Sequence, residues 1–435
     1  MRTCIRDVSI LTMVPGEPPI DEGYLVIDGE SITAVQAGSP EPSLAAACDE
    51  MVDGRGRLAL PGFINAHTHV GMMPFRNYAS DLPLQAWLFD KLFPVEDKLT
   101  EEDVYWAAQV GIAEMIRTGT TCFADMYMFA DTLAAVVEET GVRADISRGL
   151  QCFDESPDMA SDHRMQEALD LYHRWHGRAG GRITVRFGPH AVYTCTPGYL
   201  REVVQAVRPL GAGIHIHLSE TQQENTDCQK AHGRTPTQHL AALGLFELPT
   251  LAAHGVYLSA EDRALLARCG AAVVHNPGSN LKLGSGTADV RALLDQGITT
   301  ALGTDGAASN NNLDMLQEVY LAAVLSKPGC SQAVGVTAAE ALEMGTAGGA
   351  QALGFSHVGQ LQIGKQADVI LVNVDQLHYT PLNDPVAGLV YAGHGSDVET
   401  VYAAGRCLYH KGEHFTIDVP RARTALNAAA RRLLN

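Results

Sequence analysis

The 435-residue sequence has few basic residues, no paired cysteine motif and no long apolar run. Its 31 Lys and Arg residues stand against 50 Asp and Glu residues, which gives a formal net charge of −19. A nucleic-acid-binding surface needs concentrated basic side chains, so this balance argues against nucleic acid as a partner. No uninterrupted apolar stretch approaches the ~20 residues that a membrane helix needs. We therefore expect no membrane partner.

The nine cysteines are scattered along the chain, and no Cys-x-x-Cys pair occurs. An odd, dispersed set is typical of reduced thiols rather than of a disulfide framework. Residues 1–10 enter directly into strand-like alternation. We therefore expect a cytoplasmic location.

A pair of histidines follows a strand-like apolar run at residues 58–66. Side chains alternate between faces along a strand, so His67 and His69 point the same way and lie close enough to share one ion. A divalent metal site is the natural interpretation. The alternative is that two histidines at the end of a buried strand only satisfy local hydrogen bonds.

Three later apolar runs also lead into residues that can bind a metal or move a proton. These residues are His217 with Glu220, His254, and Asp305. Chance histidines would be scattered over all structural contexts, whereas these follow strands repeatedly. A parallel barrel keeps its chemistry at the carboxyl ends of its strands, so the pattern favours one shared site.

Strand-like and helix-like segments alternate through the middle of the chain in a βαβ rhythm. The eight candidate strands end near His67, Asp125, Arg148, His190, His217, His254, Asn276 and Asp305. Helical periodicity is found in residues 164–175, 197–207, 260–269 and 288–296. The pattern predicts an α/β fold with a (β/α)₈ barrel over residues 58–358. The alternative, an open doubly wound sheet, lacks its Gly-x-Gly-x-x-Gly turn after the first strand.

Short strands broken by Gly, Pro and Asp fill residues 1–57 and return at residues 359–418. Each piece alone is too small for a stable core, so we expect both ends of the chain to build one small β-sandwich domain. Residues 419–435 are expected to form a C-terminal helix, because Asp418 precedes them and Pro420 lies in the first turn.

With its site residues on predicted strands one, five, six and eight, the chain resembles the amidohydrolase superfamily. The resemblance also includes the composite β-domain and residues 359–368. Members with two metals bridge them by a carboxylated lysine from strand four, but no lysine occurs between Lys98 and Lys230. The resemblance therefore implies one divalent metal ion per subunit, with Zn²⁺ favoured over Fe²⁺ and Mn²⁺. Its implied ligands are His67, His69, His217 and Asp305.

Within this superfamily the chain resembles the 5′-methylthioadenosine/S-adenosylhomocysteine deaminases. The segments that carry this resemblance are residues 87–97, 147–150, 188–190, 276–283 and 303–310. The resemblance implies that Glu96 binds the ribose hydroxyls and that His190 contacts the substrate. It also implies that Arg148 and Arg164 hold the carboxylate of a homocysteine group.

The residues alone leave other interpretations of these positions open. Glu96 lies among charged neighbours, and this spacing alone favours a solvated surface carboxylate. Arg148 ends a buried strand, where an unpaired guanidinium is costly. It therefore meets either an anion or a structural carboxylate such as Asp125.

The family chemistry implied here is hydrolysis of the adenine amino group to give an inosine-type nucleoside and ammonia. A bound metal would activate water at neutral pH. Glu220 would carry a proton from this water to N1 of the ring, and His254 would orient the attacking oxygen or stabilise developing charge. Asp305 counts among the catalytic residues, and both Glu220 and Asp305 also contact the substrate.

Two other functions remain open from the sequence. One is an amidohydrolase that acts on another amino- or chloro-substituted heterocycle, such as guanine, cytosine or a triazine. The other is a catalytically silent metalloprotein that binds nucleosides. Glu96 and the two arginines favour a small nucleoside with an extended 5′ group, and the presence of Glu220 favours an enzyme. The sequence leaves a homo-oligomer open.

Overall fold

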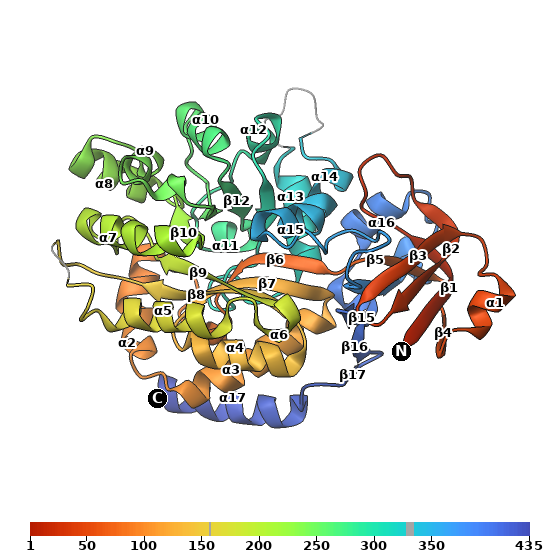
Figure 1. Ribbon diagram of the computed structural model, residues 1–435. Helices are drawn as coiled ribbons and strands as arrows, with labels where there is room; N and C mark the ends of the chain where they lie inside the picture. The colour runs from red at the N-terminus through yellow and green to blue at the C-terminus, as the bar shows by residue number, and fades with distance from the viewer. Residues whose placement is uncertain (156–157, 328–334) are drawn as a thin grey trace.

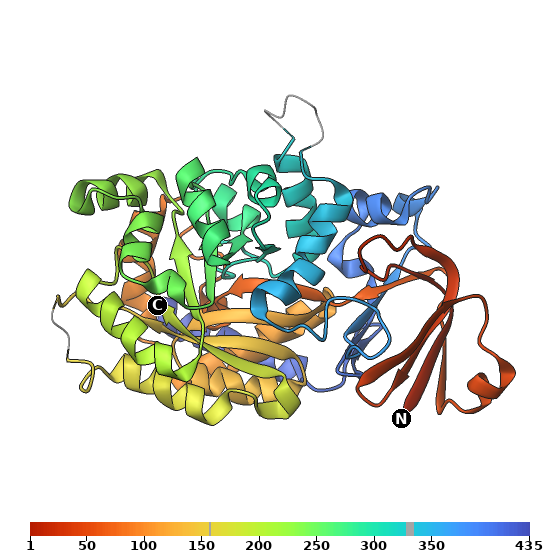
Figure 2. The same cartoon turned by 45° about the horizontal axis from the view of Figure 1, so that its top comes forward.

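The computed structural model describes residues 1–155, 158–327 and 335–435, which form a barrel and a second sheet beside it (Figures 1 and 2). The second sheet carries the N-terminus, and the C-terminal helix lies along the underside of the barrel in Figure 1. Eight cysteines fall in the described ranges and are free thiols, while Cys330 lies outside the described residues. Among the described helices, none has both the length and the apolar character needed to cross a bilayer.

Eight strands of the described chain lie side by side in sequence order, each parallel to its neighbours. They are β6 (Phe63–Thr68), β7 (Thr120–Tyr127), β8 (Arg143–Leu150), β9 (Ile183–Pro189), β10 (Ile214–Leu218), β11 (Thr250–His254), β12 (Ala272–His275) and β13 (Thr300–Leu302). A 2.9 Å backbone hydrogen bond from Asp305 N to His67 O links the segment after β13 back to β6. The predicted (β/α)₈ barrel is therefore confirmed.

Helices connect the barrel strands and cover their outer faces (Figure 1). The longer ones are α3 (Glu101–Arg117), α4 (Ala130–Thr140), α5 (His163–Trp175), α7 (Pro197–Val207), α8 (Gln222–His232), α10 (Ala260–Cys269) and α13 (Met315–Leu325). The shorter ones are η1 (Val70–Phe75), η2 (Ala86–Leu92), α2 (Phe93–Glu96), α6 (Arg178–Gly181), η3 (Arg208–Leu210), α9 (Pro236–Ala242), η4 (Leu245–Glu247), α11 (Pro277–Lys282), α12 (Val290–Asp295), α14 (Ala338–Met344) and α15 (Ala347–Leu353). The four helices predicted from periodicity are present.

Local sequence signals explain where several of these helices begin. Thr100 and Asp103 form a reciprocal capping box at the start of α3, and Ser259 and Asp262 form another at α10. Each box satisfies backbone N–H groups that have no partner inside the helix. The segments that enter α3 from α2 and α10 from β11 are thereby held in place.

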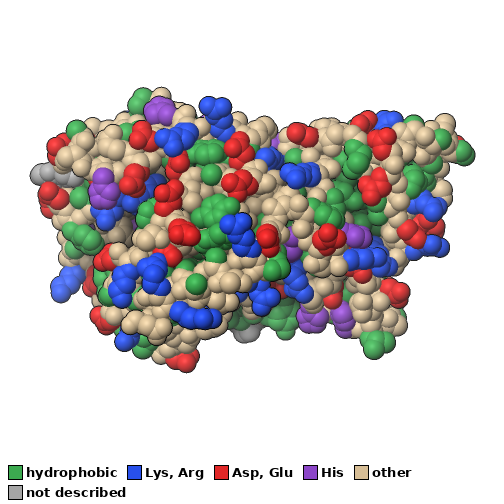
Figure 3. Space-filling view, turned by 90° about the horizontal axis from the view of Figure 1, so that it is seen from below, with side chains coloured by type: hydrophobic (Ala, Val, Ile, Leu, Met, Phe, Trp, Pro, Cys, Tyr) green, Lys and Arg blue, Asp and Glu red, His purple; other side chains and the backbone are tan. Residues whose placement is uncertain are grey.

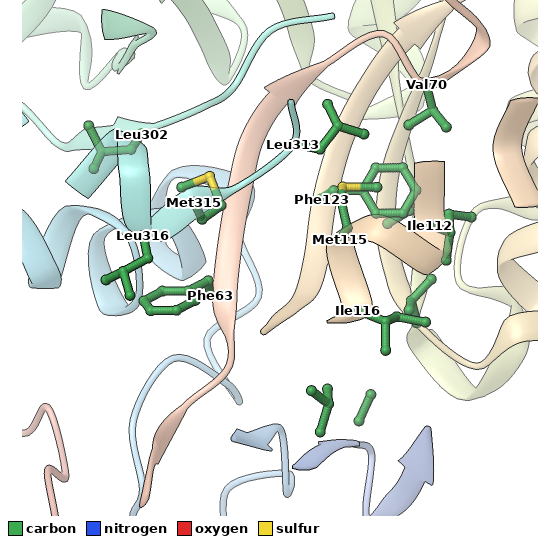
Figure 4. Close-up of a cluster of buried hydrophobic side chains, with 14 of the residues drawn as sticks. Phe63, Val70, Ile112, Met115, Ile116, Phe123, Leu302, Leu313, Met315 and Leu316 are labelled. Carbon is green, nitrogen blue, oxygen red and sulfur yellow. The ribbon is translucent and has the colours of Figure 1, made fainter. Parts of the chain in front are cut away.

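The core beside β6 is made of apolar side chains from the barrel and two of its helices. Phe63 lies beside Leu316 of α13, and Phe123 of β7 lies beside Ile112 and Met115 of α3 (Figure 4). All five side chains are buried, and burying one of this size contributes roughly 1.5–3 kcal/mol. This packing fixes the position of β6, which contains His67 and leads to His69.

Strands from both ends of the chain share the second sheet. Nine strands of the described chain form it, in the order β17-β16-β15-β14-β5-β1-β2-β3, with β4 paired to β1. Their bounds are β1 (Arg2–Ile10), β2 (Ile20–Asp28), β3 (Ser31–Ala37), β4 (Glu50–Asp53), β5 (Arg57–Pro61), β14 (Val369–Asn373), β15 (Val398–Ala403), β16 (Arg406–His410) and β17 (Glu413–His414). The antiparallel pairing of β5 with β14 joins the two ends, so the predicted composite of both chain ends is confirmed.

The second sheet is tied to the barrel by a buried ion pair. Arg143 at the start of β8 lies 3.1 Å from Asp368, and both side chains are buried. Other helices of this part are α1 (Pro42–Ala46), η5 (Leu377–Tyr379), α16 (Pro385–Ala392) and η6 (Gly395–Asp397). Breaking such a pair would leave an uncompensated buried charge, so the pair fixes how the two parts meet.

The chain ends in helix α17 (Val419–Leu434), which packs along α3 on the lower face of the barrel (Figure 1). Asp418 caps its first turn by accepting from Arg421 N, and Arg432 pairs with Asp103 of the α3 capping box. On this lower face acidic and basic side chains are interspersed (Figure 3). Helix α17 therefore stabilises α3, the helix that follows η2 and α2.

Candidate active site

The four predicted metal ligands lie together at the carboxyl end of the barrel. His67 is the last but one residue of β6, His69 follows that strand, His217 lies on β10, and Asp305 follows β13. His69 Nε2 is 3.3 Å from His217 Nε2 and 3.2 Å from Asp305 Oδ1. His67 Nε2 is 3.6 Å from the same Asp305 oxygen. Two strand ends and two following loops therefore aim four donor atoms at one point.

Hydrogen bonds on the far side of each ring orient these imidazoles. Nδ1 of His69 donates to Met126 O at 2.6 Å, and Nδ1 of His217 donates to His190 O at 2.8 Å. Because a carbonyl only accepts, the proton of each ring in its neutral form lies on Nδ1, which leaves Nε2 free to face the centre. His67 Nδ1 lies 2.8 Å from His215 Nε2.

The charges of the cluster favour a cation at its centre. Burial would raise the pKa of Asp305, but the hydrogen bond and charge of His69 hold it well below its usual range. Burial would lower the pKa of His69, yet Asp305 raises it to about 9. The same carboxylate that favours a proton on His69 favours a bound metal at that position. Burial and neighbouring imidazoles keep the pKa values of His67 and His217 well below normal, so both stay neutral.

These residues fit a divalent metal ion. The Nε2 atom of His67 is buried and has no hydrogen-bond partner among the described residues, which leaves its lone pair for another ligand. The donor atoms of His67, His69 and His217 lie within 4.8 Å of one another, as do those of His67, His254 and Asp305. Three imidazoles and one carboxylate are a common donor set for such ions.

Asp305 reaches the cluster through an unusual backbone conformation. Strand β13 ends at Leu302, three residues earlier than the strand predicted from sequence, and Asp305 has a φ of 62°. His254 also lies in the left-handed region, with a φ of 76°. Such conformations cost roughly 1–3 kcal/mol in a residue with a side chain and are found at functional sites. Ser279 Oγ donates to Asp305 Oδ2 at 2.6 Å and holds the carboxylate in position.

Glu220 and His254 lie next to the ligand cluster. Glu220 Oε2 is 3.8 Å from His254 Nε2, and Ser285 Oγ donates to Glu220 Oε1 at 3.0 Å. Nδ1 of His254 donates to Asn280 Oδ1 at 2.8 Å. Burial raises the pKa of Glu220. A buried carboxyl group with a raised pKa can both accept and return a proton near neutral pH.

Glu96 is buried and does not lie on the solvated surface. Its side chain comes from α2, and Tyr127 at the end of β7 donates a 2.5 Å hydrogen bond to its Oε1. Burial is the main reason that the pKa of Glu96 is raised. The interpretation of Glu96 as a surface carboxylate, drawn from spacing alone, is therefore wrong.

A cavity of about 880 Å³ brings the remaining predicted residues together with the cluster. His190, Arg148 and Arg164 all line it, as do Trp87 and Tyr193. Burial lowers the pKa of His190 to about 3, so this ring is neutral. The cavity is large enough for a nucleoside with an extended substituent.

The two arginines differ in their partners. Arg148 Nε donates to Glu167 Oε2 at 2.6 Å, so its carboxylate partner is Glu167 rather than Asp125. Asp125 instead accepts a 2.6 Å hydrogen bond from Val70 N. Arg164 is the second residue of α5, and its guanidinium forms no ion pair within the described part of the chain.

Several residues that support the site were not identified from the sequence. They are Tyr127, Ser279, Asn280 and Ser285. Ser279 and Asn280 lie in the segment 276–283 that carried the family resemblance, and Tyr127 ends a barrel strand, so signals existed for these three. Ser285 lies on a loop with no comparable signal.

Comparisons with known proteins agree with this geometry. The sequence profile of the amidohydrolase family matches residues 58–408. The 5-methylthioadenosine/S-adenosylhomocysteine deaminase of Caldanaerobacter subterraneus subsp. tengcongensis is 43% identical over 436 residues, which cover 100% of this chain and 99% of that protein. The protein of the same name from Moorella thermoacetica is 45% identical over 415 residues, or 95% of each chain.

A solved structure shares the whole fold. The adenosine deaminase from Xanthomonas campestris with bound zinc superimposes with a TM-score of 0.92 at 32% identity, covering 99% of this chain and 98% of that one. A triazine hydrolase variant at 24% identity has a TM-score of 0.91 and shares the fold. The chain therefore belongs to the amidohydrolase family and, within it, to the 5′-methylthioadenosine/S-adenosylhomocysteine deaminases.

Proposed function

We propose that this enzyme hydrolyses the amino group at C6 of adenine in S-adenosylhomocysteine and 5′-methylthioadenosine, and also in adenosine or 5′-deoxyadenosine. Water and the nucleoside give an inosine-type nucleoside and ammonia. The observation that carries the proposal is that one cavity contains both the Glu220–His254 pair beside the ligand cluster and the buried Glu96–Tyr127 pair. The names and high identity of the bacterial relatives support it.

His67, His69, His217 and Asp305 would hold the metal ion. We favour Zn²⁺ over Fe²⁺ and Mn²⁺ because imidazole-rich sites suit zinc and because the Xanthomonas enzyme has zinc bound. When bound, such an ion acts as a Lewis acid that lowers the pKa of a coordinated water to about 7.

Glu220 carries the proton in the proposed reaction. Its raised pKa lets it accept a proton from the attacking water and donate it to N1 of the adenine ring. Protonation at N1 takes up the electron pair displaced by attack at C6. The second proton of the water passes to the amino group, so that the C6–N bond breaks with release of ammonia and the oxygen stays on C6 as a carbonyl. Ser285 keeps one carboxylate oxygen in place during these transfers.

The other cavity residues position the substrate. His254, held by Asn280, orients the attacking oxygen, and Asp305 contacts the amino group that leaves. Neutral His190 hydrogen-bonds to the adenine ring. Glu96 accepts from the ribose hydroxyls, while Tyr127 fixes its other side.

The 5′ group reaches Arg148 and Arg164 in this arrangement. A guanidinium fork matches a carboxylate in geometry and charge, so both arginines favour a homocysteine group. The partner is thus a small nucleoside. The free thiols of the described cysteines favour a reducing, cytoplasmic environment.

A substrate panel tests the proposal. The zinc-loaded enzyme is incubated with the four nucleosides, and the adenine-to-hypoxanthine absorbance change is followed together with ammonia release. We expect both signals in equal amounts, and a lower kcat/KM for 2′,3′-dideoxyadenosine than for adenosine. Guanine, cytosine and a chlorotriazine are the comparison compounds. Preferential turnover of any of them, or binding of nucleosides without ammonia, would contradict the proposed function.

A further inference from the structure

One face of helix α5 forms the outer wall of the cavity. Arg164, Glu167, Leu171 and Arg174 line the cavity and recur at intervals of three or four residues, so they lie on the same side of the helix. In Figure 1 this helix runs beside β8, the strand that carries Arg148. The wall thus alternates in charge along its length.

Most of the positive charge on this wall is already neutralised. Arg148 pairs with Glu167, and Arg174 lies 3.0 Å from Asp131. Arg164 is left as the cavity-lining arginine without an ion pair within the described ranges. The outer part of the cavity has three arginines and, against them, these carboxylates: Asp97, Glu101, Asp131, Glu167 and Asp170. An excess of carboxylates disfavours a 5′ group that carries only negative charge.

The interaction of Glu167 with Arg148 uses only one of the two carboxylate oxygens of Glu167. Its Oε2 accepts from Arg148 Nε at 2.6 Å, while Oε1 forms no hydrogen bond with other described residues. The side chain is 53% exposed and lines the cavity. Arg164 lies three residues earlier on the same face, and side chains so placed have Cβ atoms roughly 5–6 Å apart. A guanidinium donor and a carboxylate acceptor therefore start from neighbouring positions on one helix face, and within the described residues no ion pair joins them.

We propose that Glu167 determines substrate specificity by binding an ammonium group at the end of the 5′ substituent. Arg164 binds the carboxylate on the same carbon atom. The preferred substrates are then 5′-thioadenosines that end in a zwitterionic α-amino acid, and the ammonium group contributes to recognition as well as the carboxylate. This inference rests on the proposed function and concerns the part of the same cavity that binds the 5′ group of the substrate.

Four substrates separate the two charges. S-adenosylhomocysteine has both, 5′-S-(3-carboxypropyl)thioadenosine lacks the ammonium group, 5′-S-(3-aminopropyl)thioadenosine lacks the carboxylate, and 5′-methylthioadenosine lacks both. The Glu167→Gln variant removes the charge but keeps an oxygen that can accept from Arg148. For each compound, kcat/KM is expressed relative to 5′-methylthioadenosine. Glu261→Gln, on the exposed start of α10, is the matched control.

In Glu167→Gln we expect this relative kcat/KM to fall about 10-fold or more for S-adenosylhomocysteine and the aminopropyl compound. The carboxypropyl compound should keep or improve its relative value, because a competing negative charge is gone. The control variant should match the wild type. Calorimetric titration with S-inosylhomocysteine and its desamino analogue gives a second measurement, in which only the former should lose affinity.

Other outcomes would overturn this assignment. An equal loss for the carboxypropyl compound would mean that Glu167 acts only by positioning Arg148. Unchanged relative kcat/KM values would remove Glu167 from recognition of the 5′ group. The same holds if the absolute kcat/KM falls equally for all four compounds. Failure of the proposed function is distinct, because the wild-type enzyme would then not deaminate 5′-methylthioadenosine.

Discussion

The two ends of the cavity are built from different elements. At the inner end, His67, His217 and His254 come from barrel strands, are almost fully buried, and are each held by a hydrogen bond on the side away from the cavity. At the outer end, Arg164 and Glu167 come from the first turns of a helix and are partly exposed. Chemistry requires fixed atoms, whereas substrate preference can change with exposed side chains. We therefore expect substitutions at the inner end to impair metal binding or turnover, and substitutions at the outer end to change substrate preference.

The strongest test of the inner end is His217→Ala. Removal of one ligand weakens the metal site itself, so bound metal and activity should fall together, with kcat/KM reduced by on the order of 1000-fold. Metal content is measured by elemental analysis beside the kinetics. His173→Ala, an exposed histidine on α5, is the control and should retain both. A His217→Ala enzyme with full metal content and normal turnover would remove His217 from the ligand set.

Glu220→Gln should separate chemistry from metal binding within the inner end. The amide keeps the size of the side chain but cannot transfer the proton, so we expect kcat to fall at least ~100-fold. Metal content should stay at the wild-type level, because Glu220 lies beside the cluster rather than in it. The same exchange at exposed Glu261 should have no effect. Loss of metal from Glu220→Gln would identify Glu220 as a ligand.

The inner end was largely predictable from sequence because it depends on strand periodicity. His67 and His69 share a face by their spacing of two, and apolar runs lead directly to His217 and His254. The sequence predicted Asp305 beside these histidines as well, but it did not predict the left-handed backbone of Asp305 or the early end of β13. A positive φ in a residue other than glycine depends on the surrounding structure and has no clear sequence signal.

The long-range contacts could not be predicted in the same way. The Tyr127–Glu96 hydrogen bond joins residues 31 positions apart, and the Ser285–Glu220 bond spans 65 positions. Sequence patterns report which face of an element is buried, but they do not report distances between loops. For the same reason the Glu167 partner of Arg148 became visible only in three dimensions.

At the outer end, Arg164→Met should alter preference without affecting the metal. Loss of its charged hydrogen bonds should lower kcat/KM for S-adenosylhomocysteine by roughly 10- to 100-fold relative to 5′-methylthioadenosine. Arg174→Met on the same helix is the control, since Arg174 is already paired with Asp131 and should change this ratio little. A parallel loss for both substrates would show that Arg164 stabilises the fold of α5 instead.

The smallest expected effect concerns Ser285, which links a loop to the inner end. Its hydroxyl stabilises the ionised form of Glu220, so Ser285→Ala should raise the pKa of Glu220 further. Since Glu220 must be ionised to accept a proton from water, the acidic limb of the kcat/KM profile should shift to higher pH. The loss near neutral pH should be roughly 2- to 10-fold and should diminish as the pH rises. Ser356→Ala at an exposed position is the control. A loss of the same size at every pH would mean that Ser285 shapes the cavity rather than the protonation of Glu220, and the pH profile measured with 5′-methylthioadenosine decides between the two.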